Sequence, residues 1–141
     1  MALWTFRDYV TEEGQNLIQQ WYAAQDDAVR AVFDATVLIL GETEDWLNPE
    51  IEAFKELTKK HAGLGLGELR FSVDVRPPRA AKAKRRRFRP IGIFRPARRE
   101  FIFILACEKF RMNTIPPKAF DEAARYKSEF NQTRGDIHEH V

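Results

Sequence analysis

The sequence predicts one α+β domain over residues 1–141, in which an N-terminal helical hairpin and a C-terminal helix pack on one face of a small, mixed or antiparallel, four-stranded sheet. Two observations carry this prediction. The period of the apolar residues changes from 3.6 to 2 near residue 68, and an uninterrupted apolar run occupies residues 101–106. A chain of this length has the usual size of a single domain and buries a core without disulfides or metal.

The first half of the chain reads as one strand followed by two helices. Residues 3–10 alternate loosely between apolar and polar side chains, which is typical of a strand. Thr11 predicts the cap of a first helix, and Asp26 or Asp27 predicts the cap of a second, which ends at Gly41. Because the connection between them is short, we expect an antiparallel helical hairpin.

The second half reads mainly as strands. The pair Asn48-Pro49 predicts a short helix that ends near Leu57, and the alternation over 68–74 predicts the second strand. Residues 88–94 predict a third strand, and 100–107 a fourth that is buried on both faces. A last helix is expected over 118–131. We expect largely buried side chains at Leu17, Trp21, Val32, Phe33, Leu69, Phe71, Ile91, Ile93, Phe101, Phe103 and Phe120.

Charge is distributed unevenly along the chain. Residues 1–60 hold 12 acidic and 5 basic residues, whereas residues 61–118 hold 4 acidic and 15 basic ones. The segment from Arg76 to Arg99 has 11 lysines and arginines and no acid. Such a block attracts a polyanion, for which nucleic acid is the usual partner, although a solvated loop is the alternative. Its first part, about 76–87, reads as a long basic hairpin connection, and about 132–141 as a short polar tail.

Several classes of protein are disfavoured. Cys107 is the single cysteine, so no internal disulfide forms and a reducing, cytoplasmic location is expected. No run of 18 apolar residues predicts a membrane span. We expect no cofactor and no metal site, even at the His138-x-His140 pair in the polar tail. His61 is expected to be an exposed loop histidine rather than a general base.

Three segments resemble a known family when they are taken in order. The first is Gly65-Leu-Gly-Glu-Leu-Arg-Phe71, and the second is Phe88-Arg-Pro-Ile-Gly-Ile-Phe94. The third is Glu108-Lys-Phe-Arg111, followed by Pro116-Pro-Lys118 and the last helix. With the order strand, helical hairpin, three strands and helix, they resemble the RelE/ParE toxin superfamily, most of all its HigB-like, phage-derived branch. The resemblance covers nearly the whole chain and implies a RelE-like fold.

The resemblance also implies a function. It is that of the toxin of a type II toxin–antitoxin pair, an mRNA endoribonuclease (mRNA interferase) that needs no metal and usually acts on the ribosome. The implied partners are RNA, the ribosome and a cognate antitoxin, for which a helix-turn-helix protein is expected. Two alternatives stay open, a non-catalytic nucleic-acid-binding protein on the same fold and a ParE-like inhibitor of DNA gyrase.

The chemistry of RNA cleavage suggests which residues to examine. The reaction needs a base, an acid and positive charge on the phosphorane, and the guanidinium fork of arginine matches phosphate oxygens. We therefore expect Arg70 and Arg89 to be catalytic, and Glu68 to orient an arginine or to act as the base. The alternative is an ordinary surface ion pair of little energetic value. The expected RNA-binding residues are Lys59, Lys60, Lys84, Arg85, Arg86, Arg87, Lys109 and Arg111.

Overall fold

The computed structural model describes residues 2–75, 84–109 and 118–140, and every structural statement below concerns these residues. They form three helices and seven strands in an α+β arrangement. In chain order these are β1 Thr5–Val10, α1 Leu17–Ala24, α2 Asp27–Gly41, β2 Phe54–Glu56, β3 Leu66–Leu69, β4 Phe71–Val75, β5 Lys84–Arg95, β6 Glu100–Lys109, α3 Ala119–Asn131 and β7 Asp136–Glu139. Short 3₁₀ turns occupy Lys59–His61 and Pro96–Arg98.

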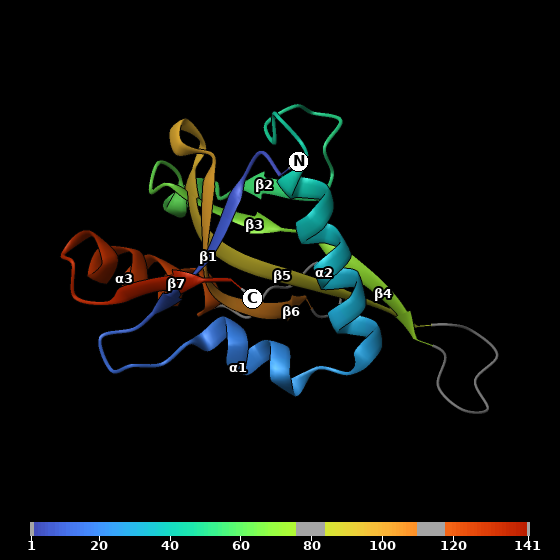
Figure 1. Ribbon diagram of the computed structural model, residues 1–141, viewed down its shortest axis with the longest axis horizontal. Helices are drawn as coiled ribbons and strands as arrows, with labels where there is room; N and C mark the ends of the chain where they lie inside the picture. Colours follow the sequence, from blue (N-terminus) through green and yellow to red (C-terminus); the bar gives the residue numbers. More distant parts are fainter. Residues whose placement is uncertain (1, 76–83, 110–117, 141) are drawn as a thin grey trace.

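The seven strands form one mixed sheet in the order β2-β3-β5-β6-β1-β7, and β4 continues from β3 along the same edge of β5 (Figure 1). β1 and β6 run parallel, and all other neighbouring strands are antiparallel. The prediction of a mixed sheet is therefore confirmed, whereas the prediction of four strands is wrong. One predicted strand is divided into β3 and β4, and β2 and β7 were not expected.

Two apolar cores lie on opposite faces of the sheet, so helices cover both faces rather than one. Phe101 and Phe103 of β6 pack into the core beneath α2, while Ile102 and Ile104 pack into the core beneath α3. This confirms the prediction that the uninterrupted apolar run is a strand buried on both faces. Most of the residues expected in the core are buried; Leu17, Trp21, Val32 and Phe120 are only partly so.

The helical hairpin differs from the prediction at its start and in its shape. Asp26 caps α2 by accepting a hydrogen bond from the Val29 N–H at 3.0 Å, as predicted. Thr11 does not cap α1, because its hydroxyl accepts from Gln15 within a turn; Asn16 is the cap. The two helices also do not lie alongside each other, since α2 leaves the end of α1 at a steep angle (Figure 1).

The predicted helix after Asn48-Pro49 is replaced by a turn and the short strand β2. The Asn48 side chain accepts a hydrogen bond from the Glu50 N–H at 3.0 Å. It therefore stabilises a turn instead of capping a helix. Phe54 of β2 is buried, with its ring centroid 4.5 Å from that of Phe94. Burial of this ring in the core has overridden the local helix signal.

The C-terminal tail, predicted to be merely polar, is the edge strand β7 paired with β1. His140 follows it, and its Nδ1 lies 2.7 Å from Oδ1 of the buried Asp8. Ile137 packs against the core beneath α3. With only one apolar residue facing inward, the segment lacks the alternation by which a strand is recognised.

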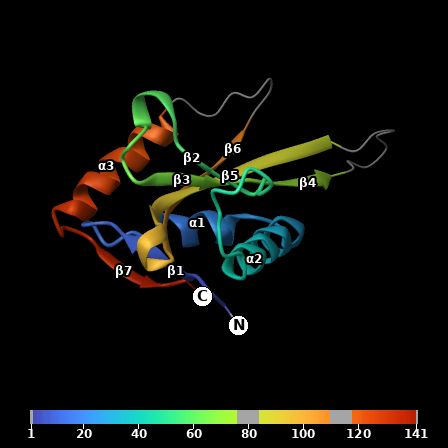
Figure 2. The same cartoon turned by 90° about the horizontal axis from the view of Figure 1, so that it is seen from above.

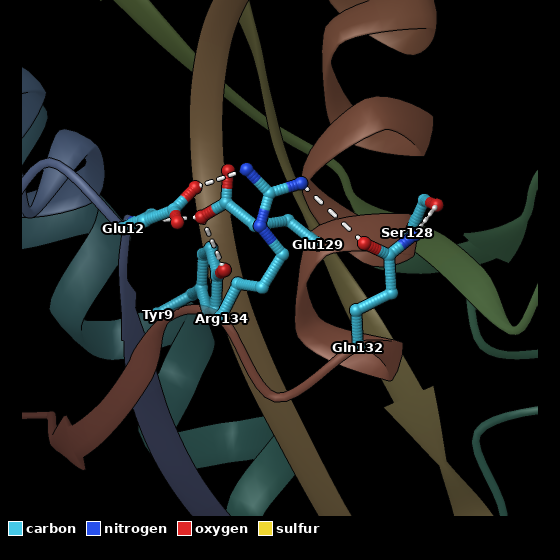
Figure 3. A network of polar contacts seen from close by, with 6 residues as sticks. All are labelled: Tyr9, Glu12, Ser128, Glu129, Gln132 and Arg134. Carbon is cyan, nitrogen blue, oxygen red and sulfur yellow. Dashed lines mark hydrogen bonds and ion pairs between the residues drawn. The ribbon is translucent and has the colours of Figure 1, made fainter.

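A polar network fastens the C-terminal end of α3 to β1 (Figure 3). The Tyr9 hydroxyl donates to Glu129 at 2.6 Å, and the Glu12 N–H donates to the same carboxylate oxygen at 2.7 Å. Arg134 pairs with the Glu12 carboxylate. Burial and the hydrogen bond to Glu129 raise the pKa of Tyr9, so it remains a hydrogen-bond donor at neutral pH. The network holds α3 over one end of the sheet.

Within the described residues, no helix has the length and apolar character needed to cross a membrane.

Candidate nucleic-acid interface

One face of β5 carries a row of arginines beyond the end of α3. Along β5, Ile91 and Ile93 lie in the core beneath α3, and alternation places Arg85, Arg87 and Arg89 on the same face. Figure 2 shows α3 over one end of the sheet and the β4–β5 ribbon extending past the other end. Among the described elements, no helix covers this part of the arginine-bearing face.

These arginines surround a pocket of about 330 Å³, which we call the arginine pocket. It is lined by one carboxylate and four guanidinium groups, from Glu52, Arg70, Arg85, Arg87 and Arg89. Arg70 lies between β3 and β4. Its backbone N–H donates a hydrogen bond to the Ala53 carbonyl at 2.7 Å. The structure therefore brings together Arg70 and Arg89, the two arginines that the sequence singled out, and adds Arg85 and Arg87.

Arg89 is the most unusual group in the arginine pocket. It is only 7% exposed, and its charge has no ion-pair partner within the described part of the chain. One guanidinium nitrogen donates to the Phe88 carbonyl at 2.8 Å, while Nε has no partner. Burial lowers the pKa of Arg89, and the nearby Glu68 carboxylate partly opposes this. Burying an incompletely paired cation destabilises a fold, so Arg89 is a candidate for binding an anion.

Glu68 and Arg70 form an ion pair at the edge of the arginine pocket, which Arg70 lines. Arg70 donates from Nε and from one terminal nitrogen to the same Glu68 oxygen, at 3.1 and 2.9 Å. Glu68 is 4% exposed, and its second oxygen has no partner. A carboxylate so buried is not a member of a surface ion pair. The geometry supports the expectation that Glu68 orients an arginine.

A second, larger hollow adjoins the arginine pocket at Arg70. It has a volume of about 560 Å³, and we call it the lysine groove. Its lining includes Lys55, Lys59, Lys60, His61, Glu68, Arg70 and Phe120. Arg70 lines both hollows, so one extended single strand of nucleic acid could contact both of them. The expected RNA-binding residues Lys59 and Lys60 therefore lie beside the expected catalytic ones, although they are distant from the arginines of β5 in sequence.

No protein-family model, curated protein or solved structure matches this chain.

β6 contributes two further groups to the arginine-bearing face. Cys107 pairs in register with Arg89, and Lys109 pairs with Arg87. Burial and the charges of Arg89 and Arg70 lower the pKa of Lys109. Burial and the Glu68 charge raise the pKa of Cys107 to about 12, so its thiol stays protonated at neutral pH and is a poor nucleophile.

The other expected RNA-binding residues do not all share this face. Arg86 lies on the opposite face, where it donates to Glu108 at 2.7 and 2.9 Å and covers the Phe88 ring. Lys84 is exposed at the start of β5, and alternation places it on the side of Arg86. Arg111 lies outside the described residues. The four expected RNA-binding residues at 84–87 are therefore divided between two faces, because the side chains of a strand alternate.

His61 also departs from the prediction, since it is buried rather than exposed. It is 8% exposed, and its Nε2 lies 2.8 Å from Oδ1 of Asp121 at the start of α3. Its ring packs edge to face against Phe120. Nothing in the local sequence indicated this contact, because its partners lie some 60 residues further along the chain. Among the described residues, no group of three or more side chains is arranged to hold a metal ion.

The neighbouring residues Arg86 and Arg87 provide a matched test of the interface. Arg87→Gln should lower the magnitude of the slope of log K against log salt for single-stranded RNA by about 0.7, as expected when one phosphate contact is lost. Arg86→Gln should leave the slope unchanged, because Arg86 is paired with Glu108 on the other face. Fluorescence anisotropy over a series of salt concentrations measures both. Equal slopes for Arg87→Gln and the unaltered protein would contradict this assignment of faces.

Proposed function

We propose that this protein binds RNA through the arginine pocket and cleaves it, as a metal-independent endoribonuclease and the toxin of a type II toxin–antitoxin pair. The observation that carries the proposal is the buried Arg89, unpaired at Nε, in a pocket lined by three other arginines. An incompletely paired guanidinium is suited to the negative charge that develops on a phosphorane.

The arrangement of elements supports a RelE-like assignment within this proposal. The elements follow one another in the order that the sequence resemblance implies, namely β1, α1, α2, the strands β3/β4, β5 and β6, and then α3. β2 and β7 are additions at the two ends of the sheet. The three segments that carry the resemblance include Glu68, Arg70, Arg89 and Lys109, which all lie on or next to the same uncovered face.

In the proposed mechanism, the arginine pocket holds the phosphate at which the chain is cut. Arg70 and Arg89 supply two guanidinium groups whose orientation is fixed before the substrate binds, Arg70 by Glu68 and Arg89 by burial. Such preorganised donors favour the more highly charged transition state over the ground state. Arg87 and Lys109 add positive charge at the edge of the pocket, where they contact flanking phosphates.

The same geometry also fits a protein that binds RNA without cutting it. The arginine pocket and the lysine groove provide phosphate contacts in either case. In this second candidate function Arg89 contributes to affinity, and no bond is broken.

Expression in bacteria without a partner protein tests the proposal. We expect growth arrest accompanied by loss of intact mRNA, relieved by co-expression of a cognate antitoxin. Plasmid supercoiling, measured in the same cells, should remain normal. Growth arrest with altered supercoiling and intact mRNA would contradict the proposal and indicate a gyrase inhibitor. Normal growth with undamaged mRNA would leave RNA binding as the function.

A further inference from the structure

A histidine–aspartate pair lies on the wall of the lysine groove. His61, in the turn Lys59–His61, and Asp121, at the start of α3, are joined by the 2.8 Å contact between Nε2 and Oδ1. His61 and Phe120 both line the groove, and the edge-to-face contact of their rings limits how the imidazole can turn. The pair therefore has a fixed orientation and stands outside the arginine pocket.

The hydrogen bond to Asp121 determines which ring nitrogen is available. A carboxylate accepts hydrogen bonds and donates none, so Nε2 carries the proton and the neutral imidazole presents Nδ1 as an acceptor. Within the described residues, Nδ1 makes no hydrogen bond and is not among the fully enclosed polar atoms. It thus keeps some solvent exposure, in a residue that lines the groove. An aspartate holding one imidazole nitrogen while the other faces a reacting group is the arrangement of a general base.

The charged groups around the pair are mostly basic. Asp121 also pairs with Lys60 at 3.2 Å, and the hydrogen bonds from His61 and Lys60 lower the pKa of Asp121. Asp121 therefore stays ionised at neutral pH. The other charged groups lining the groove are Lys55, Glu56, Lys59, Glu68 and Arg70. Glu68 is already committed to Arg70. Of the other two groups on this wall that can accept a proton, Glu56 has no side-chain partner among the described residues, whereas His61 is held in place by Asp121.

We infer that His61 is the general base of RNA cleavage, with Asp121 as its positioning residue, and that the lysine groove holds the nucleotide whose 2′-hydroxyl attacks. This inference rests on the proposed function, because it needs a phosphate in the arginine pocket. Arg70, which lines both hollows, connects the two halves of the site.

The step balances without a metal or a second reactant other than water. Nδ1 of His61 takes the proton from the 2′-hydroxyl, and the 2′-oxygen forms a bond to phosphorus. The bond from phosphorus to the 5′-oxygen breaks, and this oxygen takes a proton from a water molecule in the open hollow. The resulting hydroxide is neutralised by the proton that His61 then releases. The products are a 2′,3′-cyclic phosphate and a 5′-hydroxyl.

Single-turnover cleavage of a short RNA over a range of pH tests the inference. For the unaltered protein, the rate should rise with pH, because a general base accepts a proton only in its unprotonated form. His61→Gln should lower the rate by about 10²- to 10⁴-fold and remove this rise, while RNA affinity stays unchanged. The matched control is His138→Gln, which alters an exposed histidine of β7 and should change neither the rate nor its pH dependence.

Asp121→Asn provides a second variant that keeps the imidazole. Asp121 is 53% exposed, so its replacement should leave the protein folded even where His61→Gln does not. The rate should fall because an amide no longer dictates which imidazole nitrogen carries the proton. Cleavage at the unaltered rate and pH dependence in His61→Gln, or in Asp121→Asn if His61→Gln does not fold, overturns the inference and leaves the proposed function intact. If the unaltered protein binds RNA but does not cleave it even with ribosomes present, the proposed function fails and this inference fails with it.

Discussion

Replacing Arg89 with methionine is expected to lower RNA cleavage by about 10²- to 10³-fold, the usual cost of losing one preorganised donor to a developing anion. Methionine keeps much of the length of the arginine side chain and removes its charge. The loss should appear in the rate of the chemical step as well as in binding, because a fixed guanidinium interacts more strongly with the phosphorane than with the ground-state phosphate. Single-turnover cleavage at saturating protein measures the step directly.

The same variant should melt at an unchanged or higher temperature. Arg89 is buried with Nε unpaired, so the folded state carries a desolvation cost that methionine does not incur. Loss of cleavage with retained stability would show that the guanidinium is kept for function. Arg98→Met, at an exposed position in the turn Pro96–Arg98, is the control and should alter neither property. If Arg89→Met instead melts several degrees lower, Arg89 is a structural residue and the proposed role is wrong.

Replacing Phe101 with alanine is expected to lower the free energy of unfolding by about 3–5 kcal/mol. The Phe101 side chain is fully buried in β6, and its ring meets Phe103 at 5.0 Å and Trp46 at 5.7 Å between centroids. Gly92 on the neighbouring strand packs against the same ring, with no room for a side chain of its own. The cavity left by the missing ring is therefore bounded by a rigid part of the sheet and closes poorly. Urea unfolding followed by circular dichroism measures the change.

Leu38→Ala is the matched control for this stability prediction. Leu38 is 65% exposed on α2, and its truncation should change the free energy of unfolding by less than about 0.5 kcal/mol. Similar losses for the two variants would mean that β6 is not the centre of the core.

The central part of the fold could be predicted from the sequence because the burial of apolar side chains determines the structure there. Phe101, Ile102, Phe103 and Ile104 form a run that only a strand covered on both faces can bury, and Asp26 caps α2 where a helix was expected. The edges of the sheet do not follow in this way. β2 depends on Phe54 reaching Phe94 across the sheet, which is a contact that no local pattern encodes.

The candidate site could be predicted only in part, because some of its contacts join segments that lie far apart in the sequence. The family resemblance and the chemistry of RNA cleavage pointed to Arg70 and Arg89, and the structure brings them to one pocket. The alternation of side chains along β5 places Arg86 and Arg87 on opposite faces of the sheet. A count of basic residues along the sequence does not show this division. The pairing of His61 with Asp121 could not be predicted, because it arises only when α3 packs beside the turn before β3.

The central claim is tested most directly by incubating the purified protein with mRNA, either with ribosomes in magnesium buffer or without ribosomes in buffer containing EDTA. We expect RNA fragments that end in a 2′,3′-cyclic phosphate and begin with a 5′-hydroxyl, and we expect Arg89→Met to form them about 10²- to 10³-fold more slowly under the same conditions. RNA that remains intact in the presence of ribosomes, or cleavage of ribosome-free RNA that stops when EDTA is added, would contradict the account.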